Sequence, residues 1–210
     1  MPKFVQFGCG MVAPRSWINY DGSPTVRLKN VPLLGQLLKP WLYADFPRNV
    51  RFGDIIKGLP ETDGSCDGMY SCHVLEHLSF EDGKKALANT YKLLKVGGVF
   101  RIVVPDLAFE ARQYIQKLEA GDAGAGNFFM HDSLMGRPNR PKTLKHILSD
   151  IWGSWYHLWM WDSASLTQAL RQAGFSQVRL CAMGDAANPV FAEVEQAKMW
   201  VNVVALEAIK

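Results

Sequence analysis

Residues 79–105 read SFEDGKKALANTYKLLKVGGVFRIVVP, and this stretch decides the fold class. Ser79 opens a capping-box pattern, and apolar residues follow at the spacing of one helix face, namely Ala86, Leu87, Tyr91 and Leu94. Val99–Val104 is rich in β-branched residues and stops at Pro105, which cannot donate to a sheet. The stretch therefore predicts a helix that ends at Gly97-Gly98, a turn, and a buried strand.

The sequence on either side extends this pattern. Short apolar runs before it predict four further strands, at Phe4–Phe7, Trp17–Tyr20, Val50–Phe52 and Gly68–Cys72. After it we expect a helix from about Asp162 to Gly174, then two strands, Gln177–Ala182 and Trp200–Ile209. Because no convincing helix separates these two strands, they indicate an antiparallel hairpin at the sheet edge. The alternation predicts an α/β fold with a mostly parallel sheet.

Length and composition indicate one globular domain. The chain has 210 residues, 48% of them hydrophobic and 20% charged, which excludes a disordered or fibrous protein. We expect a single domain over 1–210, with the irregular stretch at about 107–161 as a lid or insertion. The net charge of +3 is too small to indicate a nucleic-acid partner.

The cysteine pattern and the N-terminal residues indicate the cellular compartment of the protein. The four cysteines form no CxxC pair and are expected to be reduced thiols: Cys9, Cys66, Cys72 and Cys181. The first residues lack the apolar stretch of a signal peptide, and no apolar run approaches the length of a membrane span. We therefore expect a cytoplasmic protein with no membrane partner.

A glycine turn, Gly8-Cys9-Gly10, follows the first expected strand. Ligands of open α/β sheets bind at the carboxyl ends of the strands, where glycine lets the backbone come close; the alternative is a tight strand exit without a ligand. The turn also fits G-x-G-x-x-A, but the next acid, Asp21, follows too soon for a dinucleotide site. Residues 11–16 would supply only about 9 Å of helix. We expect an extended loop there, which disfavours NAD.

Two acids end neighbouring strands. Asp21 follows the second strand, where a carboxylate can accept both hydroxyls of a ribose. Asp54 follows the third, where it could accept from an adenine amino group. Either acid could instead cap the segment that follows it.

Residues 66–78, CDGMYSCHVLEHL, and residues 93–107, LLKVGGVFRIVVPDL, closely resemble class I S-adenosylmethionine-dependent methyltransferases. The nearest branch is the methyltransferase type 11 group, in particular small bacterial members with a shortened first crossover. The resemblance covers about residues 3–107, with weaker support from 157–162 and 173–175. It implies a three-layer, Rossmann-like fold with a seven-stranded sheet and the final hairpin at one edge.

The resemblance also implies S-adenosyl-L-methionine as the cofactor and gives roles to matched positions. Gly8 and Gly10, with Cys9 between them, would lie beside the methionine part, and Asp21 would bind the ribose. The other implied cofactor contacts are Asp54 near the adenine and Ser71, Cys72 and His73 after the fourth strand. The chain departs from the wider superfamily in lacking room for the first helix, which bears on cofactor affinity.

Methyl transfer from a sulfonium proceeds by in-line attack, so the protein mainly aligns a nucleophile and excludes water. An oxygen nucleophile also needs a base. His73 and Asp106 are the candidate catalytic residues, because they follow the fourth and fifth strands. The next candidates are His131, His157 and His77, although a histidine more often makes an ordinary structural hydrogen bond.

The expected lid carries an aromatic and a basic cluster. An aromatic cluster of this density more often forms the apolar core of a lid than a surface on which a ligand ring stacks. Its members are Trp152, Trp155, Tyr156, Trp159 and Trp161. Its basic residues either hold an anionic group of the acceptor or form a solvated loop: Arg137, Arg140, Lys142 and Lys145.

The sequence therefore favours an enzyme that transfers a methyl group from S-adenosylmethionine to a small molecule or saccharide. One alternative is a degenerate domain of the same fold that binds without catalysis. Another is a zinc peptidase, because His73-Val74-Leu75-Glu76-His77 fits H-x-x-E-H. That motif would straddle a strand end here, and the sequence marks no third ligand, so we expect no metal site. The oligomeric state is left open.

Overall fold

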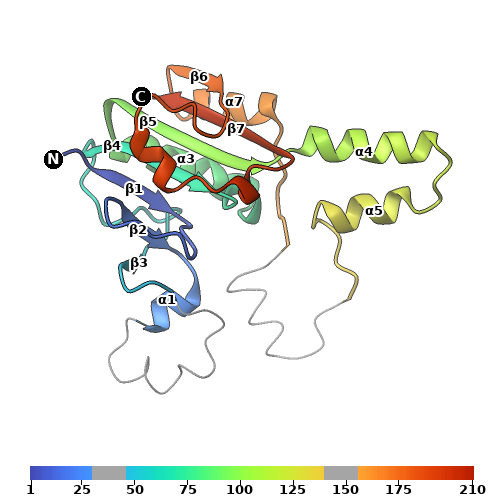
Figure 1. The fold of residues 1–210 in the computed structure, drawn as a ribbon, viewed down its shortest axis with the longest axis horizontal. Helices are drawn as coiled ribbons and strands as arrows, with labels where there is room; N and C mark the ends of the chain where they lie inside the picture. The colour runs from blue at the N-terminus through green and yellow to red at the C-terminus, as the bar shows by residue number, and fades with distance from the viewer. Residues whose placement is uncertain (30–45, 140–155) are drawn as a thin grey trace.

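The computed structural model describes residues 1–29, 46–139 and 156–210, and within them a seven-stranded sheet forms the centre of the molecule (Figure 1). The strand order is β3-β2-β1-β4-β5-β7-β6. The strands are β1 (Phe4–Phe7), β2 (Ile18–Asp21), β3 (Val50–Phe52), β4 (Cys66–Cys72), β5 (Leu94–Pro105), β6 (Gln177–Leu180) and β7 (Val203–Ile209). Strands β1 to β5 pair in parallel, and β7 runs antiparallel to β5 and β6. The predicted α/β sheet with an antiparallel C-terminal hairpin is confirmed.

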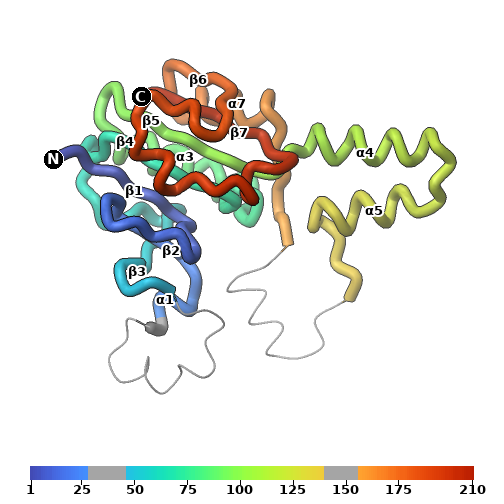
Figure 2. Tube along the Cα trace, in the orientation of Figure 1, coloured from blue at the N-terminus to red at the C-terminus, as the bar shows by residue number. Residues whose placement is uncertain are grey.

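Helices and 3-10 turns surround this sheet. The helices are α1 (Pro24–Lys29), α3 (Phe80–Leu93), α4 (Leu107–Glu119), α5 (Ala125–Asp132) and α7 (Ser163–Gln172). The 3-10 turns are η2 (Leu75–His77), η3 (Pro189–Glu193) and η4 (Ala197–Met199). Helices α4 and α5 pack against each other and project away from the sheet (Figure 2). None of the helices in the described ranges is long and apolar enough to cross a membrane, and all four cysteines are free thiols.

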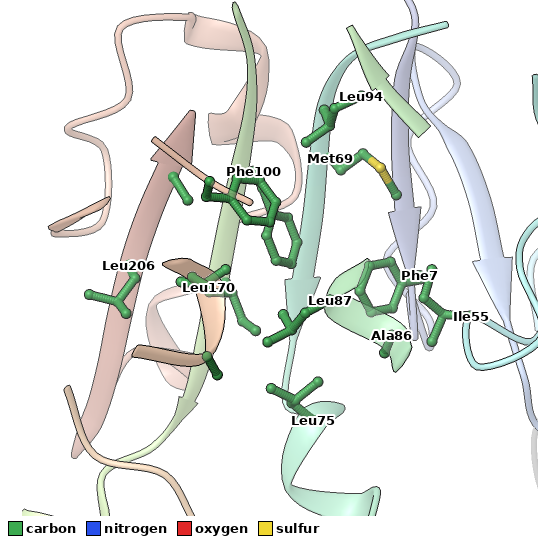
Figure 3. Packing of buried hydrophobic residues seen from close by; sticks show 14 of the residues in the cluster. Phe7, Ile55, Met69, Leu75, Ala86, Leu87, Leu94, Phe100, Leu170 and Leu206 are labelled. Atoms are coloured by element: carbon green, nitrogen blue, oxygen red, sulfur yellow. The ribbon is translucent and has the colours of Figure 1, made fainter. Parts of the chain in front are cut away.

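The larger apolar core lies between the sheet and helices α3 and α7. Phe7, Met69 and Phe100 come from neighbouring strands and meet Leu87 of α3 and Leu170 of α7 (Figure 3). These side chains are nearly or fully buried, and burial of one such side chain stabilises the fold by about 1.5–3 kcal/mol. The core therefore holds the strand ends in a fixed relation to each other.

The opposite face of the sheet carries a buried arginine. Arg101 of β5 has no exposed surface, and its guanidinium lies 2.7 Å from Glu195, 2.7 Å from Glu207 and 2.8 Å from Asp185. Because strand residues alternate between faces, Phe100 and Ile102 pack toward the helices while Arg101 faces this acid cluster. The ion pairs tie β5 to the C-terminal segment.

One predicted helix end is wrong. Helix α3 begins at the Ser79 cap as expected, but it ends at Leu93 instead of Gly97-Gly98. Leu94 is fully buried and already pairs with Cys66, after which the strand register shifts. The glycines lie in that irregularity inside β5, with Gly97 at φ +78°. Burial of Leu94 in the sheet therefore overrides the continued helical pattern.

The predicted end of α7 is confirmed. Asp162 and Ser165 form a capping box at its start. At its end Gly174 has φ +112°, and the N–H of Phe175 donates to Leu170 O over 3.2 Å. These are the features of a Schellman ending.

The crossover from β1 to β2 contains no helix, as predicted. Two buried side-chain amides hold its loop. Gln6 Nε2 donates to Val12 O over 2.6 Å and Asn19 Nδ2 donates to Pro14 O over 3.0 Å. The Gln6 amide also donates to Asn19 Oδ1, so β1 and β2 are joined beneath the loop. The short connection is therefore held by hydrogen bonds from the strands themselves.

Candidate cofactor and active site

The glycine turn and Asp21 meet at the carboxyl ends of β1 and β2. The N–H of Gly10 donates to Asp21 Oδ2 over 3.0 Å, and the N–H of Ser23 donates to Oδ1 over 2.8 Å. Gly10 has φ +53°, and a Cβ added there would meet no atom within 4 Å. The turn therefore presents its backbone to open space and holds the carboxylate beside it.

Gly8 serves a different purpose. It has φ +66°, and a Cβ at this position would overlap Val74 Cγ2. Val74 follows the fourth strand, so only glycine lets the turn after β1 lie against the turn after β4.

Asp54 lies at the same edge of the sheet. The N–H of Gly53 donates to Asp21 O over 3.2 Å, which ties the end of β3 to the end of β2. The Asp54 carboxylate accepts from the N–H of Ile56 over 3.0 Å and lies 3.5 Å from Lys57 Nζ. It thus caps its own turn, the alternative that the sequence left open.

Ser71 and Cys72 end β4, and Ser71 is in register with Phe7 of β1. The Ser71 hydroxyl is buried and has no hydrogen-bond partner among the described residues. An unsatisfied buried hydroxyl costs about 1–3 kcal/mol, so this atom marks a place where a ligand can donate or accept.

The cysteines of this region are not nucleophiles. Burial raises the pKa of the Cys72 thiol to about 12. Burial, with the nearby Asp21 charge, raises the pKa of Cys9 to about 12. Both are thiols at neutral pH, whereas the thiolate is the reactive form.

His73 adopts φ +53° directly after β4. Its Nε2 lies 3.0 Å from Met199 O, and its Nδ1 lies 3.1 Å from Oε1 of the fully buried Glu76. Burial lowers the pKa of His73, but Glu76 and the Met199 carbonyl outweigh it and raise the pKa above its ordinary value. Both ring nitrogens therefore face acceptors within the protein.

Asp106 follows β5 and caps α4, where its Oδ1 accepts from the N–H of Ala108 over 2.9 Å. Its Oδ2 lies 3.5 Å from Arg112. Asp106 also lines a hollow of about 420 Å³ together with Cys181 and Trp200. The two candidate catalytic residues thus follow neighbouring strands, β4 and β5.

The remaining candidate histidines and the described aromatic and basic residues of 137–161 do not form one site. The rings of His77 and His157 meet with centroids 5.0 Å apart, whereas His131 is exposed on α5. Trp161 is buried in the main core between the sheet and helices α3 and α7 and not in a separate lid core, while Trp159 is 42% exposed. The candidates Trp152, Trp155, Arg140, Lys142 and Lys145 lie outside the described residues.

Arg137 is exposed and Tyr156 is half-buried, both at the margins of the described ranges. The guanidinium carbon of Arg137 lies 4.8 Å from the centroid of the Tyr156 ring. Arg137 therefore makes a cation–π contact with Tyr156.

Sequence reasoning missed the importance of Glu76, which it weighed only as a peptidase base. Glu76 is the acidic residue of an otherwise apolar and histidine-containing run, 73–78, and it has no exposed surface. The signal for Glu76 in the sequence was an acidic residue within an otherwise apolar and histidine-containing run.

The strand order, the glycine turn after β1 and the acid at the end of β2 define the class of Rossmann-like, S-adenosylmethionine-dependent methyltransferases. Residues 5–102 match the family model for the methyltransferase domain, Methyltransf_11. The chain therefore carries a methyltransferase domain of this class, whose cofactor is S-adenosylmethionine, and the resemblance drawn from the sequence is confirmed. Curated protein sequences gave no match.

Solved structures share this fold. An S-adenosylmethionine-dependent methyltransferase from Thermotoga maritima, described as a possible histamine N-methyltransferase, aligns with a TM-score of 0.52 and 15% identity. The alignment covers 100% of this chain and 83% of that one. PigF with SAH aligns with a TM-score of 0.50 and 15% identity, covering 99% of this chain and 50% of that one. At 15% sequence identity, these structural similarities establish the shared fold alone.

Proposed function

We propose that this chain binds S-adenosylmethionine across the ends of β1, β2 and β4 and transfers its methyl group to a small molecule or saccharide. The observation that carries the proposal is the contact between the Gly10 N–H and the Asp21 carboxylate beside open space. The unpartnered Ser71 hydroxyl on the neighbouring strand supports it. These residues suit a ligand with a ribose and an amino-acid end.

Each residue has a role that follows from its position. A carboxylate has about four acceptor sites, and Asp21 uses one on each oxygen for backbone N–H groups. The remaining sites would accept the two ribose hydroxyls. The cofactor supplies an electrophilic methyl group on its sulfonium. Residues proposed to line the rest of it are Gly8, Cys9 and Gly10 at the methionine part, Asp54 near the adenine, and Ser71, Cys72 and His73 after β4.

We place the proton acceptor at Asp106. Among the described residues its Oδ2 has only the 3.5 Å contact with Arg112, and it borders a hollow whose volume of about 420 Å³ suits a small acceptor. His73 has both ring nitrogens engaged by Glu76 and Met199, so in this proposal it shapes the site beside the transferred methyl group.

Calorimetric titration with S-adenosylmethionine and S-adenosylhomocysteine tests the proposal. We expect both to bind the wild-type protein and Asp21→Asn to weaken binding by about tenfold or more, because each hydrogen bond to a charged group contributes about 1.5–3 kcal/mol. Asp63→Asn is the matched control, since Asp63 is exposed and, within the described residues, forms an ion pair with Lys92 alone. Absence of heat and of a thermal shift with the wild-type protein would refute the proposal.

A non-catalytic binding domain predicts a different outcome. It would bind the cofactor normally but release no S-adenosylhomocysteine with any amine or hydroxyl acceptor. Asp106→Asn separates the two cases, because for the enzyme it should lower turnover of a hydroxyl acceptor while cofactor affinity stays unchanged.

A further inference from the structure

Three side chains with metal-binding atoms converge next to the candidate active site. Glu76 and His77 lie in η2, and His157 comes from the segment that precedes α7. One donor atom from each lies within 4.8 Å of the other two. The fold therefore joins residues about 80 positions apart into one cluster of a carboxylate and two imidazoles.

Backbone hydrogen bonds build this cluster. The N–H groups of Leu158 and Trp159 donate to Glu76 O over 2.8 and 3.2 Å. The N–H of His157 donates to Leu134 O over 3.1 Å. The main chain thus fixes His157 against η2 independently of the side chains.

Glu76 and His157 carry buried donor atoms without a well-formed hydrogen bond in the described part of the chain. Glu76 has no exposed surface, and neither of its carboxylate oxygens accepts a well-formed hydrogen bond, although His73 Nδ1 lies 3.1 Å from Oε1. His157 Nδ1 is also buried without a partner. Burying a carboxylate costs several kcal/mol unless charges compensate it, so Glu76 favours a cation beside it in addition to His73.

One of the two histidines, His77, is oriented as metal ligands commonly are. His77 Nδ1 lies 3.3 Å from Tyr156 O, which leaves Nε2 for a metal. Nδ1 of His157 is buried without a partner among the described residues, so we assign it to the metal. A backbone carbonyl on the second ring nitrogen fixes the tautomer of a metal-bound histidine.

We propose that Glu76, His77 and His157 bind one divalent transition-metal ion of the zinc class. Two imidazoles and one carboxylate form a zinc ligand set that keeps a fourth position open for water or substrate oxygen. Bonds of about 2.0–2.2 Å need donor atoms roughly 3.4 Å apart, which small side-chain rotations reach from the present spacing.

This set differs from the peptidase motif that the sequence suggested. His73 is directed to Met199 O through Nε2 and to Glu76 through Nδ1, so it supports the carboxylate from outside the ligand set. His157 takes the place of the missing third ligand, and Glu76 is a ligand instead of a base. Metal binding by these residues does not depend on the proposed methyl transfer.

Titration of tag-free, chelator-treated protein tests the proposal. We expect Zn²⁺ to bind at one ion per chain in calorimetry and to raise the melting temperature. Co²⁺ should give the visible absorption of a tetrahedral or five-coordinate site. Glu76→Gln and His157→Gln should each weaken Zn²⁺ binding by about tenfold or more, because even outer-shell changes cost 10–100-fold. His131→Gln, a change on the exposed face of α5, should leave binding unchanged.

Two results would overturn the proposal. One is a wild-type protein that binds neither ion stoichiometrically, and the other is equal binding by wild type and His157→Gln. If Glu76→Gln does not fold, His77→Gln and His157→Gln decide, since both histidines are only half-buried. Separate titration with S-adenosylhomocysteine keeps a failure of the metal site distinct from a failure of cofactor binding.

Discussion

At the scale of single residues, Gly8 controls how closely two turns of the site approach. A side chain there meets two obstacles, a left-handed backbone at φ +66° and the Val74 methyl group. Gly10 has a similar φ of +53° but open space around it. Alanine substitutions at the two glycines can therefore separate the cost of backbone strain from the cost of steric overlap.

We expect Gly8→Ala to lower the free energy of unfolding by about 2–5 kcal/mol, of which 1–2 is left-handed strain and the rest overlap. Gly10→Ala should cost only the strain, about 1–2 kcal/mol. Urea denaturation measures both. Val74→Ala should recover about 1 kcal/mol or more of the Gly8→Ala loss in a double-mutant cycle, and strictly additive effects would argue against the close approach.

Residue-scale prediction from the sequence worked where a position follows a strand end. Gly8, Gly10 and Asp21 were predicted to lie together because parallel strands end at one edge, and the structure joins them through the 3.0 Å Gly10 contact. The convergence of His157 on Glu76 could not be predicted, since the segment between them includes β5 and helices α3, α4 and α5, and the spacing of the two residues carries no signal.

At the scale of elements, the C-terminal hairpin depends on the buried ion cluster of β5. Arg101 has no exposed surface, whereas Arg179 of β6 contacts two of the same acids, Asp185 and Glu207, from a side chain that is 47% exposed. The two arginines thus share partners and differ in burial.

We expect Arg101→Ala to destabilise the protein by about 3–5 kcal/mol, because it leaves buried acids without their cation. Arg179→Ala should cost about 1 kcal/mol or less, since water screens an exposed pair. Thermal or urea unfolding of both variants checks this difference. Similar losses for the two would contradict the assignment of Arg101 as the central cation.

The same cluster predicts an acid-dependent stability. Burial raises the pKa of Asp185, but Arg179, the Ala182 N–H and Arg101 outweigh it and hold that pKa well below its ordinary value. A carboxyl with a lowered folded pKa stabilises the fold above its unfolded pKa, about 3.9. This stabilisation is lost as the pH falls below that value.

Asp185→Asn should therefore weaken the dependence of stability on pH between about 4 and 2. Urea midpoints measured across this range for wild type and variant test the expectation. Asp63→Asn serves as the exposed control. Parallel pH curves for wild type and Asp185→Asn would show that Asp185 does not carry this contribution.

Element boundaries show where the sequence pattern is insufficient. The end of α7 could be predicted because glycine at the left-handed position has one common use there. The end of α3 could not, because Leu93 and Leu94 are both buried, one in the helix and one in the strand, and an apolar pattern does not tell these apart.

At the scale of the whole molecule, the order of the sheet follows from the alternation of strands and helices and from the lack of an α-helix between β6 and β7. The missing first helix is compensated locally, because Gln6 and Asn19 hold the connecting loop. The glycine turn and Asp21 consequently occupy the same edge as the ends of β3 and β4. The central claim is that this edge binds the cofactor without the usual first helix.

A crystal structure of the protein grown with S-adenosylhomocysteine tests that claim most directly. We predict ribose hydroxyls within about 2.5–3.2 Å of the Asp21 carboxylate, the adenine beside Asp54 and the homocysteine along Gly8–Gly10. Crystals in which the ligand lies elsewhere, or in which side chains fill the space beside Gly10 and separate Asp21 from it, would contradict the account.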